Sequence, residues 1–569
     1  MNVPKRLIKT LHIPTFILWS GSVFISSTSH PEMAELWCRI WTYISLFTLC
    51  VYFCSSIFKE RNWNTETARI FKSFFCIGIL EMAYALLQFL GVFPSANRHF
   101  LLTGTFDNPA VLAMLISLCF PIGCHFTVNS TARHKLIWKG LTVSMGVCLI
   151  LTGSRTGILS GICSFALICR PAIKQHLQKL SRTNIVILLF TTLLLLTGLY
   201  FHKQDSVNGR ILIWRIAMEM IADRPMWGWG REGFDAFYMP YQADYFLHHP
   251  ASQHILLADN LTNPFNEFLL FAIRYGLIGL AALLLSLVFL LRSILKQKSD
   301  FRGMLIGIFT TLFLWSMFSY PFRIPFVWLT TVSFISIILF PNLSSHKYAK
   351  PLSTFILLCC FPPIIHILHF HYNKIEWIKV QERSSDVETT DLFTQYALLY
   401  ERLKGDGDFL YNYGAELHYA GQYKKSLDIL KECTTLYNDY NVQMLMADNY
   451  QQLGFTDKAI LRYKYANLMV PNRFLPLYYE MQVHIKERDR YPSLQSSPNH
   501  HQQTRQKPKV TYRKKDNKRG RKIPSRPHLL NSMQSKNHNA IKSAYSALAS
   551  SNKFRGDNLT CKPRCPALT

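Results

Sequence analysis

Long apolar runs separated by short polar links dominate the chain up to residue 372. A helix of about 20 apolar residues crosses the ~30 Å hydrocarbon core of a bilayer. The pattern therefore predicts an all-α fold, a polytopic membrane helix bundle with about eleven spans. The predicted spans are 13–28, 36–58, 70–93, 107–128, 139–153, 156–169, 184–201, 263–291, 303–320, 322–341 and 351–370. Span 13–28 resembles a signal peptide, but no convincing small-residue cleavage site follows it, so we interpret it as a retained anchor.

The stretch 138–169 does not fit one span. A single helix of that length would measure ~48 Å, and both ends carry Lys or Arg, so the segment is expected to enter and return. The turn is expected at TGSRTG, residues 152–157. The two arms are then too short to cross fully, which places Arg155 below the outer surface. A recessed arginine either snorkels to headgroups or binds a buried anion, and we favour the anion.

Basic residues gather in alternate links between the predicted spans. Loops rich in Lys and Arg stay in the cytoplasm, so the N-terminus is predicted to be cytoplasmic. Eleven spans then place loop 202–262 and everything after residue 372 on the periplasmic side of a bacterial inner membrane. The arginines of loop 202–262 oppose this bias and need another explanation.

Two further parts follow the predicted bundle of residues 1–372. Residues 373–486 are read as soluble helices, in which 409–441 and 442–474 align as two tetratricopeptide-like repeats offset by 33 residues. Small residues recur at matching places, which lets paired helices approach closely. The repeats are expected either to bind a partner protein or acceptor, or to act as a rigid cap. Residues 487–569 are polar and basic and are predicted to be a disordered tail, or the product of an altered reading frame.

Composition agrees with this division. The chain has 569 residues, of which 49% are hydrophobic, and a net charge of +28. The tail carries about half of that charge, and its predicted compartment argues against nucleic acid as a partner. The 14 cysteines are scattered, mostly as single residues inside apolar runs, which is typical of small buried hydrophobes and not of disulfide or zinc sites.

Loop 202–262 carries the main candidates for chemistry. Residues 207–222 are predicted to form a helix with Arg210 in its first turn, where guanidinium and helix N-terminus would together attract an anion. Arg210 could instead pair with a nearby acid. Arg215 and the aromatic residues around it form a candidate sugar-binding surface, which could equally sit at the bilayer interface. The aromatic residues are Trp214, Trp227, Trp229, Phe234, Phe237, Tyr238, Tyr241 and Tyr245.

The next span opens with the residues NPFNEF, 263–268. Glu267 is a candidate general base for a hydroxyl acceptor, although an acid here would also complement the helix dipole. Asn266 is a candidate substrate contact. His248, His249 and His254 do not have the spacing of a helical metal pair, so no metal and no cofactor are expected.

Four motifs in order resemble those of the bacterial O-antigen ligase and O-antigen polymerase superfamily. They are GTFDNPAVLA at 104–113, TGSRTG at 152–157, the GR-x3-W-x8-D-x-P-x2-G-x-G run at 209–230, and NE-x8-G-x2-G at 266–279. The resemblance covers about residues 70–340.

The resemblance implies a metal-independent transfer, with inversion, of a glycan from an undecaprenyl diphosphate carrier to a hydroxyl on a lipid, glycan or protein. It further implies that Arg155 and Arg210 hold the diphosphate. The family has a His-Asn pair at the head of the following span, and here Phe265 stands at the histidine position beside Asn266. The base is then Glu267 or a loop histidine, or the reaction relies on stabilising the leaving group.

Two other classes of function remain open from the sequence. A lipid-linked glycan transporter would be expected to show two related halves with matching interrupted helices, and none are evident. A non-catalytic repeat scaffold would leave Arg155 and Arg210 without a role. Within the transferase class, O-antigen ligation, polymerisation of a surface polysaccharide and protein O-glycosylation are not distinguished.

Overall fold

The computed structural model describes residues 12–24, 31–58, 63–95, 97, 99–170, 204–297, 299–344, 349–384 and 389–490. These residues form eighteen α-helices and two short 3-10 helices, and they contain no strand. The chain separates into a compact unit, Met1–Tyr478, and a second unit, Tyr479–Thr569. Helix α21 (Leu475–Arg490) spans that division. The all-helical prediction is confirmed for the described part of the chain.

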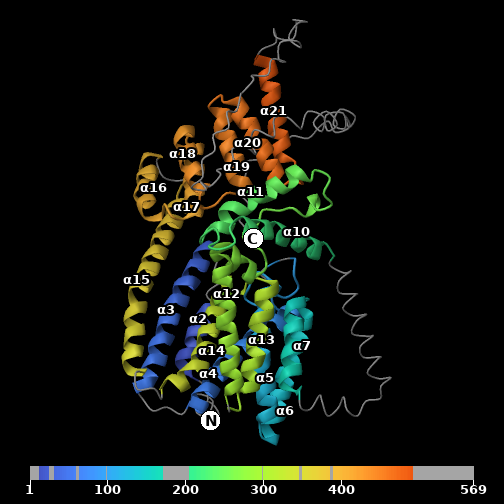
Figure 1. Ribbon diagram of the computed structural model, residues 1–569, viewed down its shortest axis with the longest axis vertical. Helices are drawn as coiled ribbons and strands as arrows, with labels where there is room; N and C mark the ends of the chain where they lie inside the picture. The colour runs from blue at the N-terminus through green and yellow to red at the C-terminus, as the bar shows by residue number, and fades with distance from the viewer. Residues whose placement is uncertain are drawn as a thin grey trace, which may run out of the picture. The chain divides into compact units, whose positions relative to one another are not determined.

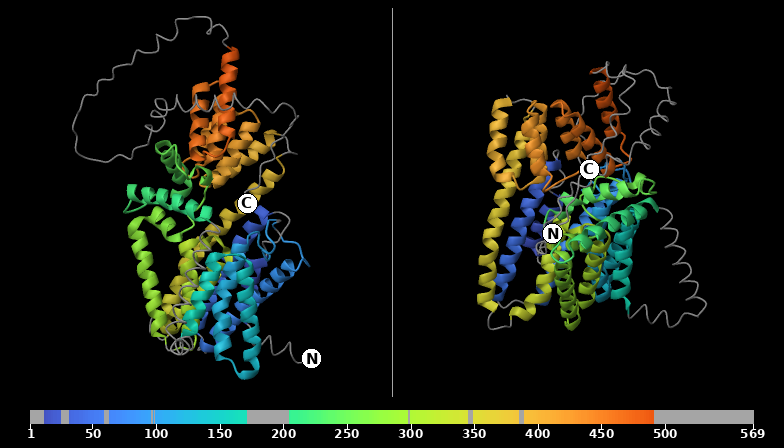
Figure 2. Two further views of the ribbon diagram at one scale, coloured as in Figure 1. Left: turned by 90° about the vertical axis from the view of Figure 1, so that its right-hand side faces the viewer. Right: turned by 45° about the horizontal axis from the view of Figure 1, so that its top comes forward.

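Ten apolar helices form the bundle seen in Figure 1 and, from two other sides, in Figure 2. Six of them are long and apolar enough to cross a bilayer, and four are shorter. Ten of the eleven predicted spans coincide with them, while span 184–201 lies outside the described residues, so the number eleven stays a prediction. The helices are α2 (Ile13–Phe24), α3 (Pro31–Phe58), α4 (Trp63–Phe89), α5 (Pro109–Asn129), α6 (Ala132–Leu151), α7 (Arg155–Ile168), α12 (Glu267–Lys296), α13 (Arg302–Phe318), α14 (Pro325–Ser344) and α15 (Ala349–Glu382).

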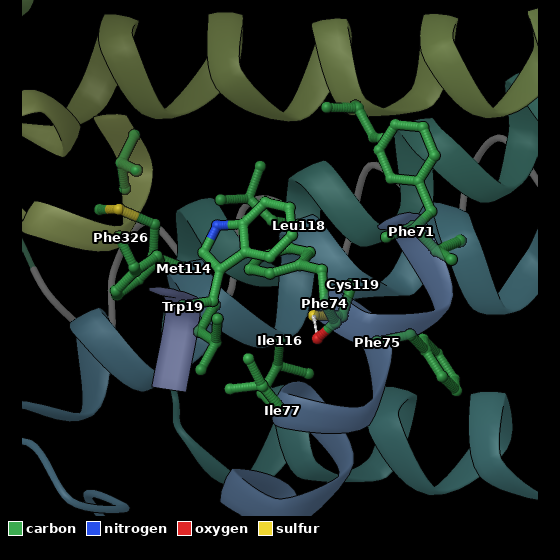
Figure 3. Close-up of a cluster of buried hydrophobic side chains, with 14 of the residues drawn as sticks. Trp19, Phe71, Phe74, Phe75, Ile77, Met114, Ile116, Leu118, Cys119 and Phe326 are labelled. Atoms are coloured by element: carbon green, nitrogen blue, oxygen red, sulfur yellow. Dashed lines mark hydrogen bonds between the residues drawn. The ribbon is translucent and has the colours of Figure 1, made fainter. Parts of the chain in front are cut away.

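Buried apolar side chains from α2, α4, α5 and α14, several of them aromatic, form a cluster within the bundle (Figure 3). Trp19 of α2 packs on Phe74 of α4 with ring centroids 5.1 Å apart. Gly78 of α4 leaves room for Cys119 of α5, whose Sγ lies 2.5 Å from where a Cβ on Gly78 would stand. Lipid is as apolar as these side chains, so close van der Waals contact through small residues has to stabilise the bundle. This packing places α5 against both α4 and α7.

The GTFDNP motif is a structural loop between α4 and α5. Glu81 is fully buried and accepts hydrogen bonds from the Thr105 amide at 3.1 Å and the Thr105 hydroxyl at 2.7 Å. The Gln88 side-chain nitrogen donates to the Gly104 carbonyl at 2.9 Å, and its side-chain oxygen accepts from the Gly104 amide at 2.9 Å. Asn108 caps α5. A buried carboxylate needs such partners, since an unpaired one would be costly in the membrane. Thr105 and Asn108 of this motif therefore serve the structure of the loop itself.

The predicted turn at 152–157 is confirmed as a break between α6 and α7. Gly153 has φ 63°, and the Ser154 side chain caps α7 by accepting from the Gly157 amide at 3.3 Å. Helix α6 begins at Ala132, earlier than the predicted residue 139, so its twenty residues reach ~30 Å. Helix α7 has fourteen residues and reaches only ~21 Å. Arg155 is the first residue of this short helix.

Two helices of the large loop lie across one end of the bundle (Figure 1). They are α10 (Gln204–Asp223) and α11 (Gly233–His248), and a 3-10 turn, Ile255–Leu257, follows them. The predicted helix 207–222 is confirmed, but it begins at least three residues earlier. Arg210 therefore lies in the second turn, and the expectation that it shares the N-terminus of its own helix is wrong.

After the bundle, α15 runs on without a break through the predicted domain boundary at 372/373. Helix α16 (Thr389–Leu403) follows it, and then two helical hairpins. The first hairpin pairs α17 (Gly407–Tyr419) with α18 (Tyr423–Cys433), and the second pairs α19 (Tyr440–Gln452) with α20 (Thr456–Met469).

The small residues aligned in the sequence lie at the helix contacts of these hairpins. The Ser426 hydroxyl donates to the Gly414 carbonyl at 2.6 Å, and Ala447, Ala459 and Ala466 are fully buried. Glycines 421 and 454 make the two turns with positive φ. The two paired-helix units agree with the predicted repeat boundaries, whereas their assignment as tetratricopeptide repeats remains a prediction.

Candidate functional site

Arg155 stands at the start of α7, where the bundle meets the large loop. Its Nη2 donates to the Ser206 hydroxyl of α10 at 3.2 Å. Among the described residues, its guanidinium has no carboxylate partner. An arginine that carries five donors and uses one of them on a neutral hydroxyl retains most of its capacity to bind an anion.

Arg210 lies on α10, one turn beyond Ser206, and feels the charge of Arg155. Burial lowers the pKa of Arg210, and the neighbouring positive charge of Arg155 lowers it further. Its guanidinium carbon lies 5.6 Å from the centre of the Phe265 ring. No acid pairs with it in the described part of the chain, so the alternative that Arg210 serves an internal ion pair gains no support. The two predicted arginines are thus neighbours.

Phe265 is held in an unusual backbone conformation beneath Arg210. Its φ is 52°, the left-handed region that branched and bulky side chains avoid, and no other non-glycine residue in the described ranges has a positive φ. The Asn263 side chain accepts from the Phe265 amide at 3.1 Å, and the Tyr320 ring packs edge-on against it at 5.7 Å between centroids. Strain of this kind is maintained where the surroundings fix it, often at functional sites.

Asn266 and Glu267 both support the start of α12. The Asn266 side chain caps the helix by accepting from the Phe268 and Leu269 amides at 2.9 and 3.1 Å. Glu267 Oε1 accepts from the Phe322 amide at 3.3 Å. These partners give both residues a positioning role at the site, next to Phe265.

The segment 320–323, which Glu267 holds, joins α13 to α14 and forms a short 3-10 turn, Pro321–Arg323. Arg323 Nη1 donates to the Thr262 hydroxyl at 2.9 Å, and the Trp328 indole donates to the Phe322 carbonyl at 2.7 Å. Tyr320 at the head of this segment is therefore fixed beside Phe265. Sequence reasoning missed Tyr320, because only the fold brings it to the residues before α12.

The glycines at the end of the third motif and in the fourth motif have a structural role. Helix α12 is interrupted at Gly276, which has φ 69° and ψ −173°. The freed backbone groups bind the segment 225–230: the Trp229 and Gly230 amides donate to the Ile273 and Arg274 carbonyls at 2.7 and 3.0 Å, and the Leu277 amide donates to Pro225 at 2.6 Å. This backbone pairing, called the kink lock below, fixes the loop on α12.

The predicted aromatic surface is mostly an internal core. Phe234, Tyr238, Tyr241 and Tyr245 are buried, whereas Trp227 has 78% of its surface exposed. These rings fill the space between α10, α11 and the start of α12. The expectation of a broad exposed aromatic face is therefore wrong, because the rings supply the apolar contacts that hold the loop helices together.

The substrate-binding candidates of this loop likewise differ in exposure: one is buried, one is half-buried and one is exposed. Tyr238 is fully buried, stacks on Phe234 at 4.6 Å and donates to Gln242 at 3.1 Å. Its position assigns it to packing. Trp214 donates from its indole to the Pro264 carbonyl at 3.0 Å, and exposed Arg215 lies over the Tyr245 ring at 5.3 Å. Tyr238 and Trp214 both use their polar atoms in hydrogen bonds within the protein. The Arg215 guanidinium makes no hydrogen bond to any described residue.

Asp235 of α11 is a buried titratable residue of the large loop. Its Oδ2 lies 3.5 Å from Arg274 Nη2. Burial raises the pKa of Asp235 to about 6, and the charges of Arg323 and Arg274 oppose that rise only in part. The carboxyl group therefore loses its proton at a higher pH than an ordinary aspartate does.

The loop histidines do not form a metal site with their neighbours. His248 lies against Asp244, and His249 Nδ1 bonds the Tyr245 carbonyl at 2.9 Å. In the described ranges no three His, Cys, Asp or Glu side chains are grouped as metal ligands.

The repeats contact the same loop through specific polar contacts. Gln242 of α11 donates to the Met469 carbonyl at 2.6 Å, and Asn472 donates to the Ala258 carbonyl at 2.9 Å. The Asn438 amide donates to the Asp235 carbonyl at 3.1 Å. Tyr440, Ala466, Met469 and Val470 share the apolar core of α10 and α11. The loop that carries Arg210 is thus packed between the bundle and the hairpins.

Comparison with known proteins bears on this region. No curated protein matches the chain. Residues 140–284 match the family described as O-antigen ligase, about a quarter of the chain. That region runs from α6 into α12 and includes Arg155, Arg210, Phe265 and the kink lock, while Tyr320 lies outside it. With the apolar bundle, the match indicates an integral membrane protein in which residues 140–284 are similar to the O-antigen ligase family, whose members suggest a glycosyl-transferring activity.

Proposed function

We propose that the protein transfers a glycan from an undecaprenyl diphosphate carrier to a hydroxyl acceptor on the periplasmic face of a bacterial inner membrane. The observation that carries this proposal is the pair of neighbouring guanidiniums, Arg155 and Arg210, neither of which has a carboxylate partner in the described part of the chain. Two like charges repel, so holding them together costs free energy unless an anion binds between them. A diphosphate supplies that anion.

The pair also suits the chemistry of the departing group. As the bond from the anomeric carbon to the diphosphate breaks, negative charge grows on the phosphate oxygen. Fixed guanidiniums stabilise this charge more in the transition state than in the ground state, which accelerates transfer. Arg155 is at the start of a helix too short to cross the bilayer, so the anion would be bound close to the membrane, where the lipid tail of the donor remains.

The acceptor side of the reaction would lie toward the loop. Exposed Arg215, together with Trp214 and Asn266 at the edge of α12, is proposed to contact the sugar or the acceptor. Inversion without a metal follows from direct attack of the hydroxyl on a carbon whose leaving group is already stabilised. Glu267 as general base remains the alternative to the proton relay proposed in the next subsection.

The test is transfer by the purified protein in nanodiscs supplied with lipid-linked glycan and acceptor. R210A and R155A are each expected to lower kcat/KM by about 100- to 1,000-fold, the effect of removing one oxyanion donor. R210K should be intermediate, because it keeps the charge and loses the two-pronged geometry.

Arg231 provides the matched control. It is on the same loop, its side chain is 83% exposed, and it lies beside Glu232. R231A is expected to transfer at the wild-type rate. Transfer by R210A equal to that of R231A would contradict the proposed function. Mass spectrometry of the glycoconjugate lost on gene deletion would then identify the acceptor as lipid A core, a growing glycan or a protein.

A further inference from the structure

We propose that Tyr320 is a catalytic residue whose hydroxyl relays the acceptor's proton during glycan transfer. The inference rests on the proposed function, and it identifies a proton-transfer group that neither the sequence motifs nor the matched region 140–284 includes. It is carried by the contacts that join Arg210, Phe265 and Tyr320.

Phe265 itself has no group that can accept or donate a proton, although its backbone has the left-handed conformation that non-glycine residues rarely adopt. The left-handed region with φ near 52° favours glycine, and after it asparagine, aspartate and histidine. A phenylalanine there is strained by about 1–2 kcal/mol. The backbone geometry thus remains suited to a polar residue, while the side chain at this place is apolar.

Tyr320 brings a protic group to the same place from another element. Its ring packs edge-on against Phe265, whose ring also lies 5.6 Å from the Arg210 guanidinium carbon. A negative charge on the tyrosine would raise the pKa of Arg210, which shows that the hydroxyl lies within electrostatic reach of the guanidinium. The ring is half-buried, and its hydroxyl makes no hydrogen bond within the described residues. The hydroxyl is therefore available to a substrate next to the proposed diphosphate site.

The segment carrying Tyr320 is fixed well enough for a catalytic residue. Glu267 accepts from the Phe322 amide, Arg323 donates to Thr262, and the Trp328 indole donates to the Phe322 carbonyl. These three hydrogen bonds tie the residues after Tyr320 to the start of α12, to the loop before it and to α14. Groups held in this way lose little orientation entropy when the substrates bind.

The relay balances in protons and charge. The acceptor oxygen forms a bond to the anomeric carbon, and the bond from that carbon to the diphosphate oxygen breaks with its electron pair going to the phosphate. The acceptor's proton passes to the Tyr320 oxygen, while the tyrosine's own proton passes to an oxygen of the departing diphosphate. Tyr320 ends the step neutral, and the lipid diphosphate leaves with one added proton.

Glu267 acts as a positioning residue in this arrangement. Its Oε1 holds the Phe322 amide and hence the segment that begins with Tyr320. E267Q keeps an oxygen that can accept this hydrogen bond but cannot act as a base. This substitution therefore separates the two possible roles of Glu267.

The experiment measures transfer of lipid-linked glycan by the purified full-length protein and its variants. Y320F is expected to lower kcat by 100-fold or more, the usual contribution of acid–base catalysis, with little change in the KM for the donor, because Arg155 and Arg210 are intact. Y275F is the matched control, since Tyr275 is an exposed tyrosine of α12 in contact with Phe271. E267Q is expected to retain at least tenfold more activity than Y320F.

A second variant tests the role independently of folding. F265H introduces a titratable ring at a backbone position that tolerates histidine. In the Y320F background, F265H should restore part of the transfer, and the restored rate should rise with pH as the imidazole loses its proton near pH 6.5. A merely structural tyrosine would give no such recovery or pH profile.

The outcomes separate this inference from the proposed function. Wild-type transfer by Y320F, together with loss in R210A, would overturn the role of Tyr320 and leave the glycan transfer standing. Loss in E267Q equal to that in Y320F would assign the proton to Glu267 and also overturn the relay. Equal transfer by R210A and wild type would overturn the proposed function itself.

Discussion

Asp235 shows how one buried side chain links the loop to pH. It is on α11, outside the candidate membrane spans, and burial raises its pKa from an ordinary 3.8 to about 6. Its backbone carbonyl also accepts a hydrogen bond from Asn438 between the hairpins. Ionisation of this carboxyl group therefore places a negative charge at the contact between the large loop and the hairpins.

The sign of the effect follows from the direction of the pKa shift. A group whose pKa is higher in the folded than in the unfolded state binds its proton more tightly when folded. Its contribution to stability is complete below about pH 3.8 and is lost as pH rises through about 6. A shift of this size corresponds to roughly 3 kcal/mol, taken as an upper value.

We therefore expect D235N to remove a pH-dependent component of stability between pH 4 and 7. Thermal unfolding of detergent-purified protein should show the wild-type Tm decreasing relative to that of D235N as pH rises through 6. Asn keeps the shape and cannot ionise. Parallel Tm profiles of the two proteins across this range would contradict the assignment.

At this scale the sequence predicted part of the site. Arg155 and Arg210 could be identified as candidates because the predicted topology places them away from the cytoplasm, where basic residues are uncommon in loops. In the structure the two arginines are neighbours. The neighbour relation of Phe265 and Tyr320 could not be predicted, since 55 residues separate them and no local pattern encodes a tertiary contact. The burial of Tyr238 was hidden for a related reason: an aromatic residue in a polar loop has the same sequence signature whether it is exposed or packed.

Among the elements, α12 depends most on a single interruption. A Cβ on Gly276 would meet the Met226 carbonyl oxygen, and one on Gly228 would stand 2.5 Å from the Ile273 carbonyl oxygen. Both glycines also have positive φ. Backbone atoms cannot move aside as a flexible side chain can, so the kink lock requires glycine at both places.

G276A is expected to destabilise the protein by about 1–3 kcal/mol, or more if the steric clash is not relieved, and to loosen segment 225–230. Thermal unfolding and limited proteolysis of that segment would measure both effects. G140A is the control, because Gly140 lies in α6 with nothing within 4 Å of the added Cβ. Alanine favours a helix interior, so G140A should be neutral or slightly stabilising. A G276A variant as stable as G140A would exclude the proposed lock.

The helices themselves were the most predictable elements. Apolar runs of membrane length located ten of them, and the TGSRTG turn was located from its flanking charges. Helix ends were less predictable: α6 and α10 both extend further toward their N-termini than the apolar pattern does, because polar residues continue a helix as readily as apolar ones. The interruption at Gly276 was not predicted, since a glycine inside an apolar run gives no sign of the backbone that pairs with it.

For the whole molecule, the decisive feature is the interface between the large loop and the hairpins. Gln242 is fully buried there and donates to the Met469 carbonyl and to the Asp259 carbonyl at 3.1 Å. Apolar residues of the second hairpin complete the core of α10 and α11. A module that completes the core of its neighbour is part of the same folding unit, which favours the cap over a freely tethered binding module.

Q242A is expected to cost about 1–3 kcal/mol, because it leaves a buried carbonyl without a donor. R473A at the same interface should cost no more than about 1 kcal/mol, because its ion pair with Asp259 is exposed. Tm values of the two variants give the comparison. Equal, small effects would indicate that the loop and the hairpins are only loosely associated.

Helix α15 connects the bundle to the hairpins from a second direction. It is continuous from Ala349 to Glu382, and Lys374 near its end pairs with Asp406 at 2.7 Å just before α17. Inserting one residue into such a helix turns everything beyond it by about 100° and advances it by ~1.5 Å. The hairpins could then no longer reach Gln242 in the orientation that α15 dictates. Chimeras between this protein and its relatives should therefore be viable only when they preserve the helical phase between the bundle and the repeats.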